Sequence, residues 1–149
     1  MALSNQLEMM TSAHTPRPAP VLAEYTDFRV YLKDMYEFKR STEGTAFRPY
    51  SYTNFSAAAD IKSPNYLKLI IEGRRNLSED MMSRFSKALR LSREEAIEFK
   101  ALVRYGQAAA TVDRNQYLKE LSELRASREL DSGMIDQKAW DKVPDWIGW

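Results

Sequence analysis

The most informative segment of this 149-residue chain is residues 52–78, which read YTNFSAAADIKSPNYLKLIIEGRRNLS. Ser51 immediately precedes the segment, and serine is a favourable N-cap because its hydroxyl accepts a hydrogen bond from a free backbone N–H group. We therefore expect a short helix to begin there. Its inward face is predicted to consist of Phe55, Ala58 and Ala59.

A second helix is predicted directly after a tight turn at Asp60-Ile61, where Ile61 plugs the turn. Ser63-Pro64 opens this helix, because serine caps well and proline fits the first helical position. Gly73 is the expected C′ residue that ends it. Two short helices joined by a tight turn are typical of a helix-turn-helix DNA-binding unit. The side chains that hold the second helix to the core are predicted to be Leu67, Ile70 and Ile71.

The outward side chains of the second helix suit base recognition. Asparagine bonds an adenine in a bidentate manner, lysine bonds a guanine, and serine bonds either base, while tyrosine contacts a thymine methyl group or a phosphate. The predicted base-reading residues are Ser63, Asn65, Tyr66 and Lys68. Residues flanking the helix are suited to gripping the backbone of DNA. The predicted phosphate-binding residues are Lys62, Arg74, Arg75 and Asn76.

Positive charge is concentrated around this segment. Residues 62–90 carry seven basic and three acidic side chains, a net charge of +4, whereas residues 1–61 have a net charge of −1 and residues 91–149 of −2. This asymmetry favours a polyanionic partner such as double-stranded DNA. Asp60 is the exception, since it stands where such turns often have glycine and its carboxylate would weaken phosphate binding slightly.

The rest of the chain is also predicted to be helical. A helix is expected from near Glu24 to near Arg40, and further helices begin at Ser78, at Ser92 and near Asp113. Ser92 and Glu95 have the spacing of a capping box. No stretch alternates convincingly between apolar and polar residues, so we expect no strand. The predicted fold is all-α, a bundle of about six helices containing a Cro/lambda-repressor-like helix-turn-helix.

The expected organisation has four parts. Residues 1–23, rich in proline, serine and threonine, read as a flexible arm, and 24–111 as the helix-turn-helix domain. Residues 112–130 are predicted to form either a dimerisation helix or a helix packed on its own domain. Residues 131–149 form a tryptophan-rich tail that docks on a partner or on the domain. The predicted interface side chains are Tyr117, Leu121, Leu124, Trp140, Trp146 and Trp149.

Composition argues against an enzyme. The chain has no cysteine and a single histidine, His14, which lies among prolines and threonines. Thiol catalysis and cysteine-ligated zinc are therefore excluded, and a histidine-based metal site or catalytic triad would lack a rigid supporting shell. We expect no metal and no cofactor. No apolar run is long enough to cross a membrane and the first ten residues do not resemble a secretory signal, so we expect a cytoplasmic protein.

Three runs of sequence resemble one bacterial family. They are Tyr25–Leu32, YTDFRVYL; Ser63–Ser78, SPNYLKLIIEGRRNLS; and Glu94–Val103, EEAIEFKALV. Together they are similar to the Fibrobacter-type paralogous family of conserved hypothetical proteins, over roughly residues 24–125. The resemblance implies a Cro/repressor-like helix-turn-helix protein and a transcriptional regulator. Members usually carry a longer C-terminal domain, which we do not expect in residues 1–149.

Two hypotheses follow from these observations. The first is a sequence-specific DNA-binding transcriptional regulator that uses residues 63–72 as its recognition helix and acts as a homodimer on paired half-sites. The second is a non-catalytic protein–protein adaptor that keeps the helix-turn-helix scaffold and docks through its tryptophan-rich tail. Binding to DNA that weakens steeply with salt distinguishes the first from the second.

Overall fold

The computed structural model describes residues 18–140, with side chains through residue 130. These residues form a short 3-10 helix, six α-helices and connecting turns, with no strand among them, which confirms the all-α prediction. The elements are η1 (Leu22–Glu24), α2 (Phe28–Thr42), α3 (Tyr52–Ala58), α4 (Tyr66–Ile71), α5 (Glu79–Ala88), α6 (Arg93–Gln107) and α7 (Thr111–Trp140).

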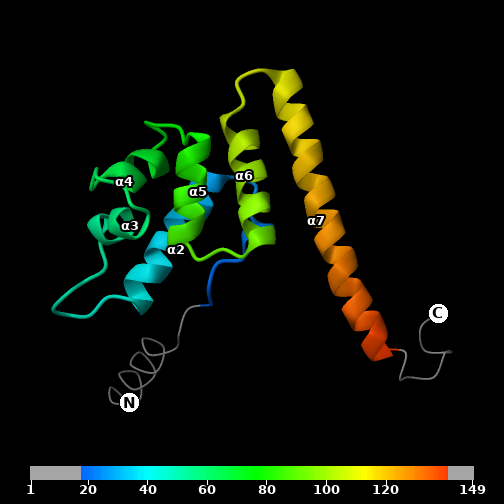
Figure 1. The fold of residues 1–149 in the computed structure, drawn as a ribbon, viewed down its shortest axis with the longest axis horizontal. Helices are drawn as coiled ribbons and strands as arrows, with labels where there is room; N and C mark the ends of the chain where they lie inside the picture. The colour runs from blue at the N-terminus through cyan, green and yellow to red at the C-terminus, as the bar shows by residue number, and fades with distance from the viewer. Residues whose placement is uncertain (1–17, 141–149) are drawn as a thin grey trace, which may run out of the picture.

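The helices lie side by side, with α4 and α3 at one end of the molecule and α7 at the other (Figure 1). Helices α2, α5 and α6 lie between them and supply most of the core. Aromatic rings dominate this core, and Phe55 of α3 meets Phe85 of α5 edge to face at a centroid distance of 4.9 Å. The largest fully buried apolar side chains include Phe28, Tyr31, Phe55, Phe85 and Phe99.

Several predicted helix starts are confirmed by cap geometry. Ser51 and Asn54 form a capping box on α3, and the Ser78 hydroxyl accepts from the Met81 amide on α5. On α6, Ser92 and Glu95 form the predicted capping box, with bonds of 3.0 and 3.1 Å. On α5 and α6 the serine hydroxyl accepts from a free helical N–H group, whereas on α3 the Asn54 side chain accepts from the Ser51 backbone N–H.

Other predicted boundaries are wrong. Helix α2 begins at Phe28 rather than near Glu24, because the Asp27 carboxylate accepts from the Arg29 amide and caps it there. Helix α7 begins at Thr111, which places Asp113 in its first turn and not at its cap. The predicted arm includes Leu22, which is instead buried, whereas residues 1–17 lie outside the described residues.

The turn between α3 and α4 differs from the sequence prediction at both ends. Ala59 is fully buried where α3 meets its neighbours, and Ala58 is exposed instead of facing inward. Helix α4 begins at Tyr66 with Asn65 as its N-cap, so Ser63 is not the cap. The carbonyl oxygen of Ser63 accepts from the hydroxyl of Ser56 at 2.8 Å, which ties residue 63 to α3.

Three consecutive helices end in the same way. In α3, α4 and α5, the C′ residue has positive φ, and its own backbone N–H and that of the next residue bond carbonyls of the last turn, a Schellman motif. The C′ residues are Asp60 (φ 58°), Gly73 (φ 76°) and Arg90 (φ 56°). Gly73 confirms the prediction. The turns after α3 and α5 use residues for which the left-handed region is less favourable.

A glycine also allows α2 and α6 to approach closely. A Cβ atom added at Gly106 of α6 would lie 2.6 Å from a ring carbon of Phe28 in α2. The aromatic ring of Phe28 is 1% exposed and fills this space. Gly106 therefore sets the packing distance between the two helices that carry much of the core.

Candidate nucleic-acid interface

Helix α4 is held to the core by one face and exposes the other. Tyr66, Leu67 and Ile70 are buried, and Ile71 is half-buried. The opposite side carries Lys68 and Glu72, which are exposed, and Leu69, which is half-buried; Asn65 lies on the same side just before the helix. Residues 65, 68, 69 and 72 repeat at helical spacing, so they share one face. This face is free of any other described element.

The prediction that Tyr66 reads bases is wrong. Tyr66 is 4% exposed, and its ring meets Phe85 edge to face at a centroid distance of 5.9 Å. Tyr66 precedes Ile70 by four residues, so both lie on the same side of α4. That spacing was available in the sequence, and it indicates a core position for Tyr66 once Ile70 is assigned to the core.

The other three predicted base-reading residues are exposed. Ser63 and Asn65 lie in the turn that leads into α4, and Lys68 lies in the first turn of α4 itself. Lys68 forms no ion pair with any residue in the described part of the chain. The three side chains therefore present a hydroxyl, an amide and an ammonium group to solvent around the start of one short helix.

The predicted phosphate-binding residues flank α4 and are all exposed. Lys62 precedes the helix, and Arg74, Arg75 and Asn76 follow it. Arg74 has a side-chain exposure of 72% and lies 3.9 Å from the Glu72 carboxylate, a distance at which an exposed ion pair is weak. The guanidinium of Arg75 stacks over the ring of Tyr66, 4.7 Å from its centroid, which orients it beside the helix.

Sequence reasoning missed Arg29, which organises the segment after α4. From the first turn of α2, its guanidinium donates to the carbonyl oxygens of Ile70 and Arg75 and to Oδ1 of Asn76. Arg29 thus adds a second bond to the Ile70 carbonyl, which already accepts from the Gly73 amide, and ties the Arg75–Asn76 segment beyond the end of α4 to α2. The only hint in the sequence is its place in the YTDFRVYL run, two residues after the Asp27 cap.

The acidic residue in the α3–α4 turn is neutralised by α5. Lys87 Nζ lies 2.9 Å from Asp60 Oδ2, and Arg84 donates to the Asp60 carbonyl oxygen. The hydrogen bond from Lys87 lowers the pKa of the Asp60 carboxyl below its ordinary value. Asp60 therefore brings a basic side chain from α5 to the turn beside α4.

The predicted interface on α7 is partly internal. Leu121 is 3% exposed and belongs to the core, so it is not a free contact for a partner; this corrects the prediction for that residue. Tyr117 and Leu124 are half-buried. The helix is fixed by Arg125 and Arg128, which both bond the buried carboxylate of Glu98. Trp140 ends α7, and its side chain lies outside the described part, as do Trp146 and Trp149.

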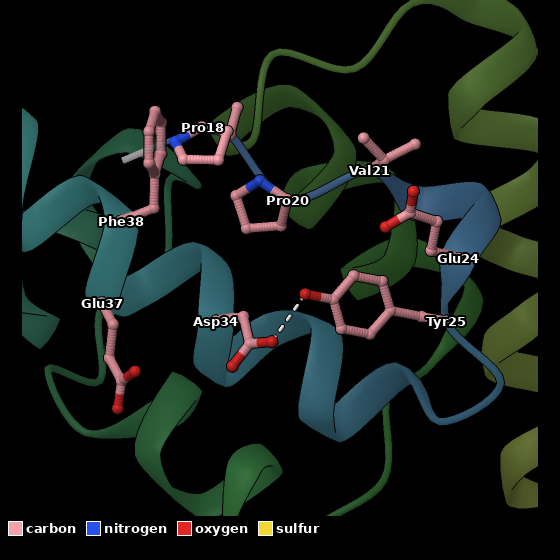
Figure 2. Close-up of a pocket in the computed structure, with 9 residues that line it drawn as sticks. Pro18, Pro20, Val21, Glu24, Tyr25, Asp34, Glu37 and Phe38 are labelled. Carbon is pink, nitrogen blue, oxygen red and sulfur yellow. Dashed lines mark hydrogen bonds between the residues drawn. The ribbon is translucent and has the colours of Figure 1, made fainter. Parts of the chain in front are cut away.

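A separate hollow of about 510 Å³ lies between the 18–25 segment and α2 (Figure 2). Pro18, Pro20 and Phe38 form apolar walls, and the Tyr25 hydroxyl donates to Asp34 Oδ2 at 2.6 Å. Burial and, next, the bond to Asp34 raise the pKa of Tyr25 to about 12. The lining contains carboxylates and no basic side chain, so this hollow does not suit a phosphate.

Comparison with protein-family models, curated proteins and solved structures finds no match to this chain. Within the described residues, no group of three or more histidine, cysteine or acidic side chains has the geometry to hold a metal ion. None of the described helices combines the length and the apolar content that a membrane crossing requires. The exposed face around α4 is therefore the best-defined candidate site.

Proposed function

We propose that the protein binds double-stranded DNA, with α3 and α4 as a helix-turn-helix and α4 as the recognition helix. The main support for this proposal is the exposed face of α4, which has polar side chains at its start and basic side chains on both flanks. A short exposed helix enters the major groove, and flanking cations grip the phosphates. Ser63, Asn65 and Lys68 are the proposed base contacts, and Lys62, Arg74, Arg75 and Asn76 the proposed phosphate contacts.

The local structure supports these roles. Asn65 and Lys68 stand three residues apart on one face, so both side chains reach the same groove. Arg29 holds the segment from Arg75 to Asn76 in place, which lowers the entropy lost when that segment meets a phosphate. The pairing of Asp60 with Lys87 removes most of the repulsion that an acidic turn residue would exert on DNA.

The test is titration of the full chain against fragmented genomic DNA, followed by sequencing of the retained fragments. We expect a discrete site whose affinity falls steeply between about 50 and 200 mM salt, since each phosphate contact releases counterions. Retention of no DNA at the lower salt overturns the proposal and favours the protein–protein adaptor.

Three variants separate the roles of individual residues. Asn65→Ala should cost about 1–3 kcal/mol at the preferred site and relax preference at one base position. Arg74→Ala should weaken binding to all sequences alike and flatten the salt slope by about one unit. Lys119→Ala, which removes the same charge from exposed α7, is the matched control and should leave both quantities unchanged.

A further inference from the structure

An open groove runs between α6 and α7, away from α4. Its volume is about 380 Å³, and all of its lining residues belong to these two helices, so no other described element covers it. Ile97, with 46% of its surface exposed, and the half-buried Leu124 form an apolar floor together with Ala101. The remaining lining residues are Arg104, Glu120, Glu123 and Ser127.

The two walls of the groove carry opposite charges. On α7 the wall contains Glu120 and Glu123. On α6 it contains Arg104, and Lys100 lies one turn before it on the same side of the helix, three residues after Ile97. Arg104 also donates two bonds of 2.8 Å to Glu79, whereas Lys100 forms no ion pair within the described residues. Lys100 does not line the groove itself, but it lies beside it on α6 and is not engaged by a described acidic residue.

The helices are antiparallel, because α7 returns along α6 after a short connection (Figure 1). Arg104 and Glu120 therefore mark one end of the groove, and Ile97 and Ser127 the other. The basic residues of α6 therefore lie beside the acidic residues of α7, at the same heights along the two helices.

A second copy of the chain fits this pattern in one orientation. A two-fold axis parallel to the helices places α6 of one copy over α7 of the other at the same height. Lys100 and Arg104 then face the partner's Glu120 and Glu123, and Ile97 and Leu124 supply the apolar contacts. An axis perpendicular to the helices instead places basic row on basic row, which is repulsive.

We propose that the α6–α7 groove is a self-association surface, on which two copies pair about an axis parallel to these helices. The contact residues are Ile97, Lys100, Glu120, Glu123 and Leu124. Helix α4 lies at the opposite end of the molecule (Figure 1), so pairing leaves both copies of α4 uncovered. The proposal goes beyond DNA binding and does not depend on it, since association is measured without DNA.

The test is sedimentation equilibrium of the full chain over a wide range of concentration. The wild-type chain is expected to dimerise. Ile97→Glu places a charge in the apolar part of the contact and should weaken dimerisation by at least about tenfold. Leu118→Glu is the matched control, because Leu118 has a similar exposure of 41% on α7 but lies outside the groove; it should leave the dimer intact.

Charge reversal tests the orientation. The double variant E120K/E123K places basic residues on both walls and should also weaken dimerisation by at least about tenfold. Adding Lys100→Glu to that variant restores opposite charges and should recover part of the affinity, with circular dichroism showing that each variant is folded. A monomeric wild-type chain, equal effects of I97E and L118E, or no recovery on adding K100E would each overturn the proposal.

Discussion

Arg29 Nη2 donates a hydrogen bond to Oδ1 of Asn76 across 2.9 Å, which joins the first turn of α2 to the segment that follows α4. Since Oδ1 is the acceptor, the Nδ2 group of Asn76 remains the donor that faces solvent. The same guanidinium bonds the carbonyl oxygens of Ile70 and Arg75. One side chain therefore fixes both the end of α4 and the orientation of an amide proposed to bind phosphate.

Replacing Arg29 by lysine should destabilise the fold. Lysine keeps the charge but cannot reach all three acceptors, and each lost hydrogen bond contributes about 1 kcal/mol, so we expect a loss of about 2 kcal/mol in the free energy of unfolding. Urea denaturation measures this free energy. Arg40→Lys is the control, because it makes the same exchange at an exposed position of α2. If both variants lose the same stability, Arg29 does not organise the segment after α4.

Tyr66→Ala should mainly lower the free energy of unfolding, because Tyr66 is a core residue. Removing a large buried aromatic side chain costs about 3–5 kcal/mol, because a cavity opens against Phe85. Tyr66→Phe keeps the ring and should cost less than about 1.5 kcal/mol. Thermal and urea unfolding of both variants measure these values. If the alanine variant is as stable as wild type and has an altered base preference, Tyr66 contacts bases and is not a core residue.

Glu98 should be the main anchor of α7. It is 1% exposed, and Arg125 and Arg128 both bond its carboxylate, while Arg125 also donates to the carbonyl oxygens of Leu22 and Tyr25. Glu98→Ala leaves these guanidinium groups without their anion and should cost about 3 kcal/mol.

Hydrogen exchange over residues 111–130 shows whether this loss falls on α7. We expect faster exchange there in Glu98→Ala than in Arg128→Ala, since Arg128 has a side-chain exposure of 40% and water replaces its partner more readily. Unchanged exchange in α7 would mean that apolar contacts around Leu121 hold the helix without the ion pairs.

Local sequence signals predicted the helices well where caps decide their ends. Ser51, Ser78, the Ser92–Glu95 pair and Gly73 each satisfy free backbone groups within their own turn, so neighbouring residues suffice to identify them. The strong Ser63-Pro64 signal failed, since α4 begins at Tyr66 and the Ser63 carbonyl oxygen accepts instead from the Ser56 hydroxyl in α3. The sequence pattern contains no information about that bond.

Long-range contacts also explain what was missed at the candidate site. Arg29 lies 46 residues before Arg75, and Glu98 lies 27 residues before Arg125, so neither pairing produces a local pattern. Periodicity alone could not decide whether Leu121 faces a partner or its own domain, since an apolar helical stripe packs equally well on either. Tyr66 differs, because its spacing from Ile70 already indicated burial.

The pair formed by Glu79 and Arg104 should make stability depend on pH in acid. The hydrogen bonds from Arg104 lower the pKa of the Glu79 carboxyl below its usual value of 4.5. A carboxyl whose pKa is lower in the folded state contributes its full stabilisation above the unfolded pKa and loses it as the pH falls through the folded pKa. Wild type should therefore lose stability below about pH 4.5 through this group.

Thermal unfolding at pH 7 and in steps below pH 4.5 tests this expectation for Glu79. Glu79→Gln removes the titrating group, so its melting temperature should fall less steeply over the acidic range. Glu129→Gln is the control, because Glu129 is exposed and forms no ion pair within the described residues. Parallel acid profiles for wild type and Glu79→Gln would show that the bonds to Arg104 have no net effect on folding.

Asp60→Asn should strengthen DNA binding under the proposed function. Asparagine tolerates the left-handed region, so the turn at φ 58° is retained. The change removes a negative charge beside α4 and releases Lys87, which now lies 2.9 Å from the carboxylate. We expect tighter binding at all sequences and a salt slope steeper by up to about one unit, because one more lysine is free to contact a phosphate.

Asp113→Asn is the control, because it makes the same charge change on exposed α7 and should alter neither the affinity nor the salt slope. Equal effects of the two variants would indicate that only net charge matters. The α3–α4 turn would then not approach DNA.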